Sequence, residues 1–262
     1  QINQEWVLYS PDKDMDVEMD LYGGKGADGQ GGASGGEGGY SRIRFTMTQN
    51  TEYVVAGMTT SINTPFIYKK GRLIACVGGG GNAGTGGNGG SGGGVEIAGE
   101  EGKGQNSGDG GRVILTGQLN SVAKFGSAFP SSIVYPGDSN ATGNEGGDAI
   151  PCTKGIYWAQ QGVSACNDVG TVKFRLSGGQ EVTNTTNSIT RGYKAGYNVI
   201  QTAGKGTNNG GRGGNGATGG DGASTSAGGG GGSGYQDGSV TVVSATLGGS
   251  TEDAKVVLRL QS

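Results

Sequence analysis

The sequence contains no histidine, and this absence limits the chemistry that the chain can perform. Histidine is the commonest general base and the usual partner of a serine nucleophile, so both arrangements are excluded. Catalysis by carboxylates alone requires two of them at a suitable separation. The acidic residues of the central region show no spacing that pairs them: Asp138, Glu145, Asp148 and Asp168. We therefore predict that the chain is not an enzyme and uses no cofactor.

Other absences exclude classes of partner. No segment approaches the roughly 18 apolar residues of a membrane span, and no basic and apolar leader opens the chain, so membrane insertion is not expected. The formal net charge is -3, without a long basic run, so nucleic acid is not the expected partner. The lack of histidine and of a close cysteine pair predicts no metal site of the zinc type. Lys205 is not followed directly by Ser or Thr, which excludes a phosphate-binding loop.

Proline is scarce and glycine abundant, with 5 and 62 residues respectively among 262. Many of the glycines recur at every third position in three runs, at 23–38, 78–93 and 210–222. Collagen shares this period but depends on imino acids, which these runs lack. We predict polyglycine II helices, which rise about 3.1 Å per residue and pair their backbone groups with neighbouring helices. The structural glycines of this prediction are Gly23, Gly26, Gly29, Gly78, Gly81, Gly84, Gly213, Gly216 and Gly219.

Strands are predicted between the glycine runs. Over residues 14–21, acidic and apolar side chains alternate strictly, the pattern of a half-buried strand. Residues 40–47 and 255–260 alternate apolar with basic side chains. We expect the acidic strand to pair beside one or both of the basic ones and form a ladder of ion pairs. The alternative is a calcium site, which would need converging ligands. Further strands are predicted at 52–58, 72–77, 112–116, 171–176, 197–202 and 239–247.

No segment combines helical periodicity with capping signals. The predicted fold class is mainly β, with β-sandwich-like strands combined with packed polyglycine II helices and essentially no α-helix. The simplest partition is a single domain over 1–262 with a loop-rich insertion at about 117–196.

The insertion concentrates aromatic residues, which are favoured anchors of recognition when rigid scaffolds hold them on loops. The candidate binding residues are Phe125, Phe129, Tyr135, Tyr157 and Trp158. The alternative is that they form a small satellite core. Cys152 and Cys166 are a candidate disulfide in an oxidising compartment, whereas Cys76 lies in an apolar run and is expected to be a buried strand residue.

Four stretches carry a resemblance to a known group of proteins. They read Val17-Glu18-Met19-Asp20-Leu21-Tyr22-Gly23-Gly24-Lys25-Gly26, then Thr51 to Gly57, and finally Tyr235 to Val243 with Ala254 to Leu260. These segments resemble a glycine-rich domain of phage tail fibres, bacterial surface proteins and a receptor kinase family. The resemblance covers about the first 115 and last 65 residues. It implies packed polyglycine II helices joined to strands, with recognition in the loops between glycine runs.

The resemblance leads to an expected function. The chain is expected to be a virion surface or tail-fibre protein that attaches without catalysis to a host surface protein or glycan. Its other partners would be virion or fibre proteins, in a multi-copy assembly such as a homotrimer. The alternative is a structural subunit of an extracellular filament, coat or virion appendage, in which exposed strand edges pair between copies.

Overall fold

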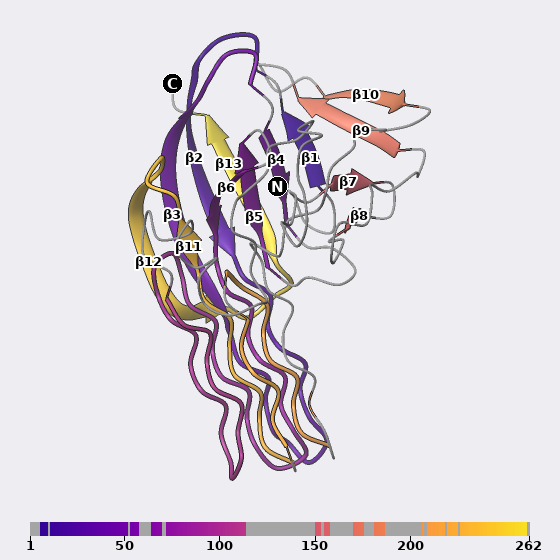
Figure 1. The fold of residues 1–262 in the computed structure, drawn as a ribbon, viewed down its shortest axis with the longest axis vertical. Helices are drawn as coiled ribbons and strands as arrows, with labels where there is room; N and C mark the ends of the chain where they lie inside the picture. Colours follow the sequence, from indigo (N-terminus) through magenta and orange to yellow (C-terminus); the bar gives the residue numbers. More distant parts are fainter. Residues whose placement is uncertain are drawn as a thin grey trace, which may run out of the picture.

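The computed structural model consists of strands and glycine-rich extended runs (Figure 1). It describes residues 6–9, 11–51, 53–57, 64–69, 72–113, 150–152, 155–157, 170–175, 181–186, 206, 209–217, 219–224 and 226–260. No helix occurs among these residues, as predicted. The strands are β1 (Trp6–Tyr9), β2 (Met15–Tyr22), β3 (Gly38–Met47), β4 (Tyr53–Ala56), β5 (Phe66–Lys69), β6 (Arg72–Cys76), β7 (Ile150–Cys152), β8 (Gly155–Tyr157), β9 (Gly170–Arg175), β10 (Glu181–Thr186), β11 (Tyr235–Gln236), β12 (Thr241–Ser250) and β13 (Lys255–Leu260).

A four-stranded antiparallel sheet has the order β12-β3-β2-β13. Alternation of side chains along β2 buries Val17, Met19 and Leu21, as the period of two predicts. The acidic side chains of β2 lie on the opposite face, where β3 and β13 place arginines beside them. The expected pairing of the acidic strand with basic strands is therefore confirmed, and both basic strands are its neighbours.

A seven-stranded sheet has the order β10-β9-β1-β4-β5-β6-β11. Its pairings are antiparallel except that of β1 with β9, which is parallel. Strands β7 and β8 pair separately as a two-stranded sheet. Strands β9 and β10 come from the insertion, so part of this segment extends the sheet.

Apolar side chains of both larger sheets contribute to one core cluster. Met19 and Ile43 come from the four-stranded sheet, and Val55, Ile67 and Ile74 from the seven-stranded one. Cys76 is completely buried at the end of β6, which confirms its prediction as a buried strand residue. This core is modest because glycine makes up so much of the chain.

Two differences separate the predicted from the observed strands. Strands β5, β7, β8, β10 and β11 were not predicted. Four of them are only two to four residues long, and β10 is a polar Glu-Val-Thr-Asn-Thr-Thr sequence. Residues 112–113 belong to no strand, contrary to the predicted strand at 112–116. Residues 114–116 and 197–202 lie outside the described residues.

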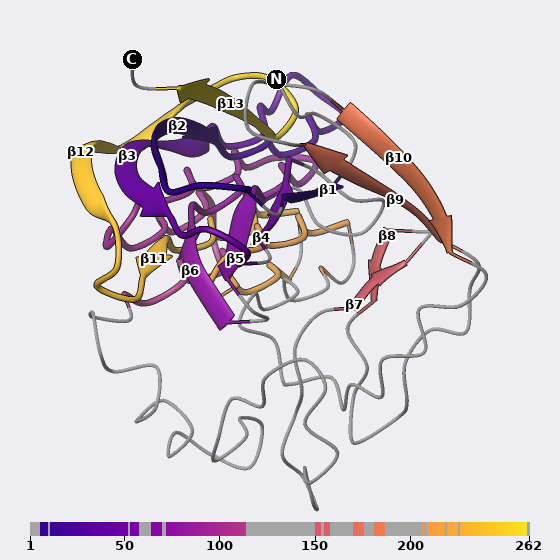
Figure 2. The same ribbon diagram turned by 90° about the horizontal axis from the view of Figure 1, so that it is seen from above.

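The glycine runs extend away from the sheets as a bundle of side-by-side segments (Figures 1 and 2). We number them along the chain as runs 1 (23–29), 2 (33–39), 3 (78–85), 4 (87–94), 5 (97–103), 6 (108–112), 7 (209–217), 8 (219–224) and 9 (226–234). Successive runs reverse direction, so runs 1 and 2, 3 and 4, 5 and 6, and 7 and 8 are antiparallel pairs. Each stretch that reads as one glycine register in the sequence is thus folded back on itself.

Backbone hydrogen bonds join the runs at every third residue. Gly78, Gly81 and Gly84 in run 3 donate their amides to run 4, to the carbonyl oxygens of Gly93, Gly90 and Gly87 respectively, at 2.7–2.9 Å. The three residues of each repeat point to different neighbours. This arrangement satisfies backbone groups that no helix or sheet ladder would pair.

Candidate functional site

Run 9 occupies the centre of the glycine bundle. Its amides donate to runs 3, 5 and 8, and its carbonyls accept from runs 4, 6 and 7. The surrounding runs are also bonded to one another in the closed order 3-4-5-6-8-7, and runs 1 and 2 pack outside runs 3 and 4. The bundle is therefore cross-linked across its whole section.

The central position requires glycine at consecutive residues. A Cβ atom on any residue from 228 to 232 would lie 1.7–2.3 Å from a backbone oxygen of a surrounding run. Such approaches are closer than any side chain permits. The sequence Gly-Gly-Gly-Gly-Gly at 228–232 is thus explained by neighbours on every side.

The predicted structural glycines lie within the bundle. For those from Gly23 to Gly216, an added Cβ would lie 1.9–2.4 Å from a backbone oxygen of another run. Gly219 begins run 8 and is partly exposed. In outer runs, by contrast, every third side chain points outward, as Lys25 and Asp28 do in run 1 and Asp109 and Arg112 in run 6.

Polar side chains extend the hydrogen-bond network at the outer runs. Asn82 in run 3 accepts the amide of Ala27 through its Oδ1, at 3.0 Å, and Asn88 in run 4 accepts the amide of Ser34 at 2.9 Å. Asp28 accepts the amide of Gly35 at 2.8 Å and pairs with Lys25 at 2.6 Å. The asparagine contacts fix the outer runs to runs 3 and 4, and those of Asp28 hold run 1 in place and join it to run 2.

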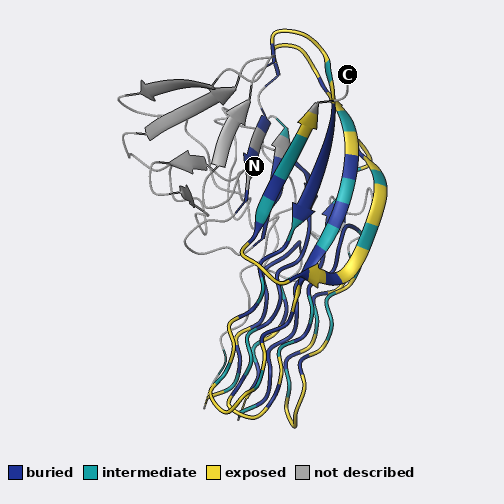
Figure 3. Cartoon of the chain, turned by 180° about the vertical axis from the view of Figure 1, so that it is seen from behind, coloured by how far each residue is buried: buried dark blue, intermediate teal, exposed yellow. Residues whose placement is uncertain are grey.

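The turns at the free end of the bundle form an exposed surface, which we call the tip. Figure 3 shows exposed residues gathered there. Apart from Ala33 and Lys103, which flank two of these turns, the described tip residues other than glycine carry amide or hydroxyl side chains: Gln30, Thr85, Gln105, Asn106, Ser107, Asn209, Ser224 and Ser226. Asn106, Asn209 and Ser226 have positive φ values of 61°, 65° and 64°, as tight reversals between runs require. The tip combines uncharged hydrogen-bonding groups with a fixed backbone.

The aromatic residues predicted to bind lie mostly outside the described residues. This holds for Phe125, Phe129, Tyr135 and Trp158. Tyr157 ends β8, and Cys152 ends β7, where it pairs in register with Gly155. Cys166, the other half of the candidate disulfide, also lies outside the described residues. The side chains of Tyr157 and Cys152 are not described.

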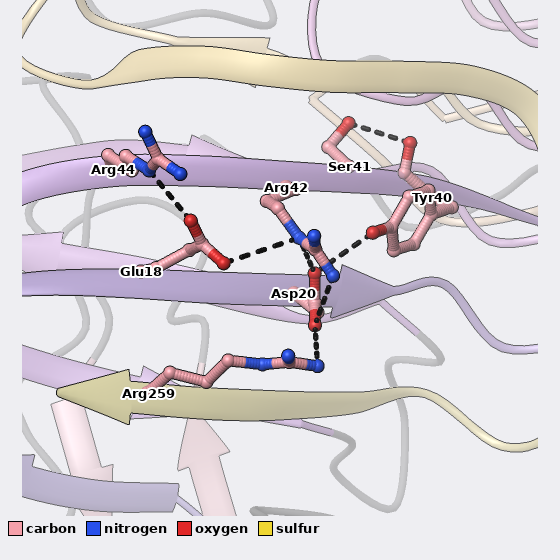
Figure 4. A network of polar contacts seen from close by, with 7 residues as sticks. All are labelled: Glu18, Asp20, Tyr40, Ser41, Arg42, Arg44 and Arg259. Carbon is pink, nitrogen blue, oxygen red and sulfur yellow. Dashed lines mark hydrogen bonds and ion pairs between the residues drawn. The ribbon is translucent and has the colours of Figure 1, made fainter. Parts of the chain in front are cut away.

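The outer face of the four-stranded sheet carries a network of ion pairs (Figure 4). Arg42 donates to Asp20 through Nε at 2.6 Å and Nη2 at 3.2 Å, and Arg259 donates to the same carboxylate at 2.7 Å. Arg44 binds Glu18 at 2.7 Å, and Arg42 also lies 3.5 Å from Glu18. The arginines pair with Glu18 and Asp20, which confirms the predicted ion-pair ladder at these two carboxylates. Asp16 instead accepts from Thr46, and Asp14 accepts the amide of Gln49.

Opposing effects act on the pKa of Asp20, and those that lower it prevail. Burial alone would raise the pKa of Asp20, but the hydrogen bonds from Arg42 and Tyr40 and the charges of Arg42 and Arg259 lower it below its ordinary value. Burial and the hydrogen bond to Asp20 together raise the pKa of Tyr40. The carboxylate is therefore charged at neutral pH, although its side chain is fully buried.

A row of aromatic side chains continues this face toward the bundle. Tyr22 and Tyr40 are opposite each other on β2 and β3, with ring centroids 5.0 Å apart. Lys255 of β13 lies over the Tyr22 ring at 5.1 Å and pairs with Glu252. The hydroxyl of Tyr40 donates to Asp20 at 2.9 Å and so links the two rows.

The comparisons with known proteins give no family for this chain. No family model matches it, and no curated protein matches its sequence significantly.

The described part of the chain contains no helix long and apolar enough to span a membrane. In the same residues, no group of three or more histidine, cysteine or acidic side chains is arranged to hold a metal ion.

Proposed function

We propose that the glycine runs are packed polyglycine II helices and that the two larger sheets form a β-sandwich beside them. The bonding of every third residue to the same neighbour matches the threefold repeat of such helices. Glycines of positive φ in the described bundle are limited to Gly31, Gly32 and Gly104, all in turns. Apart from Asn209 and Ser226, the first residues of runs 7 and 9, no described residue of the runs has a positive φ, which is compatible with the left-handed polyproline-type path. The core shared by both sheets supports the sandwich.

We further propose that the chain is a non-enzymatic surface component of a virion, such as a tail fibre, that attaches to a host surface protein or glycan. The observation that carries this proposal is the tip, where exposed amide and hydroxyl groups stand on a bundle cross-linked in every direction. Groups held rigidly lose little conformational entropy on binding, which favours affinity. The aromatic residues of the insertion are a second proposed contact. Other virion or fibre proteins would hold the chain in a multi-copy assembly.

Binding of the purified chain to intact candidate host cells tests this function. The tip variant Gln30→Ala/Thr85→Ala/Gln105→Ala removes exposed side chains at positions whose φ is not positive. We expect saturable binding by the native chain and at least a tenfold loss in this variant, on the order of two lost hydrogen bonds.

Two further variants separate the contacts. Tyr157→Ala/Trp158→Ala measures the contribution of the insertion, and Asp221→Asn, on the side of the bundle, is the matched control. Absence of saturable binding by the native chain to any candidate host would contradict the proposal. Full binding by both the tip and insertion variants would place the contact elsewhere.

A structural subunit of a filament, coat or appendage is the second candidate function. Its support is β12, an edge strand in the described part of the sheet, which displays Val243 and Leu247 at 44% and 49% exposure. Both residues lie in irregularities of the pairing with β3, where β-bulges turn extra residues outward. Bulged edges normally resist pairing, so side-chain packing rather than strand addition would join the copies.

Sedimentation measurements over a range of protein concentrations test the second function. Reversible assembly that Val243→Ser/Leu247→Ser abolishes would favour it. Monomeric behaviour of the native chain at every concentration would contradict it.

A further inference from the structure

We infer that the outer face of the four-stranded sheet binds a carboxylate-bearing polysaccharide. The face is formed by the arginines of β3 and β13, the Tyr22 and Tyr40 pair and the hydroxyl side chains of β12. This inference rests on the proposed attachment function, because it names the chemical class of the receptor. It adds a contact on the sheet to those proposed at the tip and in the insertion.

The charges on this face are layered. The carboxylate side chains of Glu18 and Asp20 are 7% and 0% exposed, whereas those of Arg44 and Arg259 are 55% and 52% exposed. Arg42 is exposed to 33%. The acids thus lie beneath the bases, and an approaching ligand meets guanidinium groups first. Its own charge must be negative to complement them.

The arginines retain donors for such a ligand. A guanidinium carries five N–H groups in a planar fork that fits a carboxylate with two parallel bonds. The ion pairs within the described residues use Nε of Arg44 and Nη2 of Arg259, and Nε and Nη2 of Arg42. The remaining N–H groups of the exposed Arg44 and Arg259 are directed by these bonds rather than free to rotate.

Fixation by the buried carboxylates reduces the cost of binding. An arginine on an open surface loses rotamer freedom when it binds a ligand. Here Arg42 is held by two bonds to Asp20, and Arg44 by one bond of 2.7 Å to Glu18. Much of that freedom is already lost in the unbound protein, so the face is organised for an anion before the anion arrives.

Groups suited to sugar rings continue the same face. Strand register places Tyr22 beside Tyr40, and Tyr40 beside Thr246 of β12. Ser244 lies opposite Arg42, and Thr241 lies opposite Arg44. Thr241, Ser244 and Thr246 are all exposed. Half-buried phenol rings offer an apolar surface with a polar end. The hydroxyl of Thr246 donates to the carbonyl of Gly248 at 2.8 Å and so offers a ligand an acceptor, whereas the hydroxyl of Thr241 can act as donor or acceptor. A polymer that carries both carboxylates and sugar hydroxyls complements the arginines, phenol rings and hydroxyls of this face.

The composition of the face also disfavours nucleic acid. Exposed Asp16 lies one row beyond Arg44 and Glu18, where it accepts from Thr46 at 2.6 Å. The net charge of -3 adds a repulsion that grows with the charge density of the ligand. A polymer with one carboxylate per sugar is less densely charged than a duplex.

The test measures binding of the full chain to polygalacturonate, with neutral dextran, dextran sulfate and duplex DNA as comparison ligands. The decisive variant is Arg44→Lys/Arg259→Lys, which keeps a positive charge over each buried carboxylate but removes the guanidinium fork. Arg112→Lys/Arg212→Lys, on the exposed side of the bundle, is the matched control. Circular dichroism and thermal unfolding establish that each variant is folded.

We expect saturable binding to polygalacturonate and a loss of at least about tenfold in the Arg44→Lys/Arg259→Lys variant, with no change in the control. Three results would overturn the inference: no binding to polygalacturonate, equal binding by the two lysine variants, or tighter binding to dextran sulfate or DNA. Host-cell binding by the same proteins separates the two proposals. Cell binding that persists in Arg44→Lys/Arg259→Lys refutes the sheet contact and leaves attachment intact, whereas a native chain that binds no cells refutes attachment itself.

Discussion

Nη2 of Arg259 lies 2.7 Å from Oδ2 of Asp20, although 239 positions separate the two residues in the sequence. The contact joins β13 to β2 and places a second guanidinium on a carboxylate that Arg42 already binds. Removing one partner of a buried ion pair leaves the other uncompensated. We therefore expect substitution of Asp20 to lower the free energy of unfolding more than substitution of any other residue of this network.

We expect Asp20→Asn to lower the free energy of unfolding by about 1–3 kcal/mol, because Arg42 and Arg259 lose their charged acceptor while both guanidiniums stay in contact with water. Asp16→Asn, on the same strand face but exposed, is the control and should have a much smaller effect. Urea unfolding at neutral pH measures both. Equal losses in the two variants would show that burial of the carboxylate is irrelevant.

The same carboxylate predicts a dependence of stability on pH. Since its pKa is lower in the folded than in the unfolded chain, its contribution is fully present above the ordinary aspartate value of about 4. It is lost as the pH falls below that value, through the lower pKa of the folded state. Thermal unfolding between about pH 2 and 7 should therefore show a smaller acid-induced loss in Asp20→Asn than in the native chain. Parallel curves for the two proteins would contradict this account.

The bundle predicts opposite outcomes for two glycines. In Gly230→Ala the new Cβ would lie 2.0 Å from the carbonyl oxygen of Asp109, so we expect a loss of about 3 kcal/mol or more. Gly86→Ala should be tolerated, because the nearest atom would be 3.9 Å away. Thermal unfolding of both variants checks the prediction. A well-tolerated Gly230→Ala would mean that run 9 is not enclosed.

Ser226 begins run 9 with a φ of 64°, a conformation that is costly for β-branched side chains. We expect Ser226→Val to be less stable than Ser226→Gly by about 1–2 kcal/mol. The comparison of the two variants by urea unfolding isolates the backbone effect, since neither retains the hydroxyl. Equal stabilities would contradict a left-handed conformation at this turn.

Burial raises the pKa of the Cys76 thiol to about 12, so the reactive thiolate is scarce at neutral pH. We expect iodoacetamide to leave Cys76 unmodified in the native chain and to alkylate it in urea. Peptide mapping by mass spectrometry distinguishes it from the other cysteines. Rapid alkylation in the native state would contradict the buried position.

The sequence predicted those parts of the fold that depend on local periodicity. The alternation of apolar and charged residues identified β2 and the arginines on the strands beside it. The side chains on one face of a strand share one environment, so their chemical character repeats every second residue. The glycine period identified bundle-forming segments but not their reversal at Thr85 and Gly86, since the register of three continues through the turn. Strand β10 escaped notice because its pairing with β9 is not reflected in any apolar alternation.

Of the candidate site, the sequence predicted the ion pairs. It did not predict that the carboxylates are buried beneath exposed arginines, because that depends on side-chain packing. It also gave no sign that residues 228–232 are central. The number of neighbours around a run is set by segments from 78 to 224, and no local pattern encodes it.

Run 9 follows every run that surrounds it in the chain. Until it is in place, the ring of runs 3 to 8 encloses a column of donors and acceptors without their final partners. Since the central run is synthesised after the runs around it, the bundle cannot fold from the inside outward while the chain is being made. Closure of the bundle depends on the late insertion of its own axis.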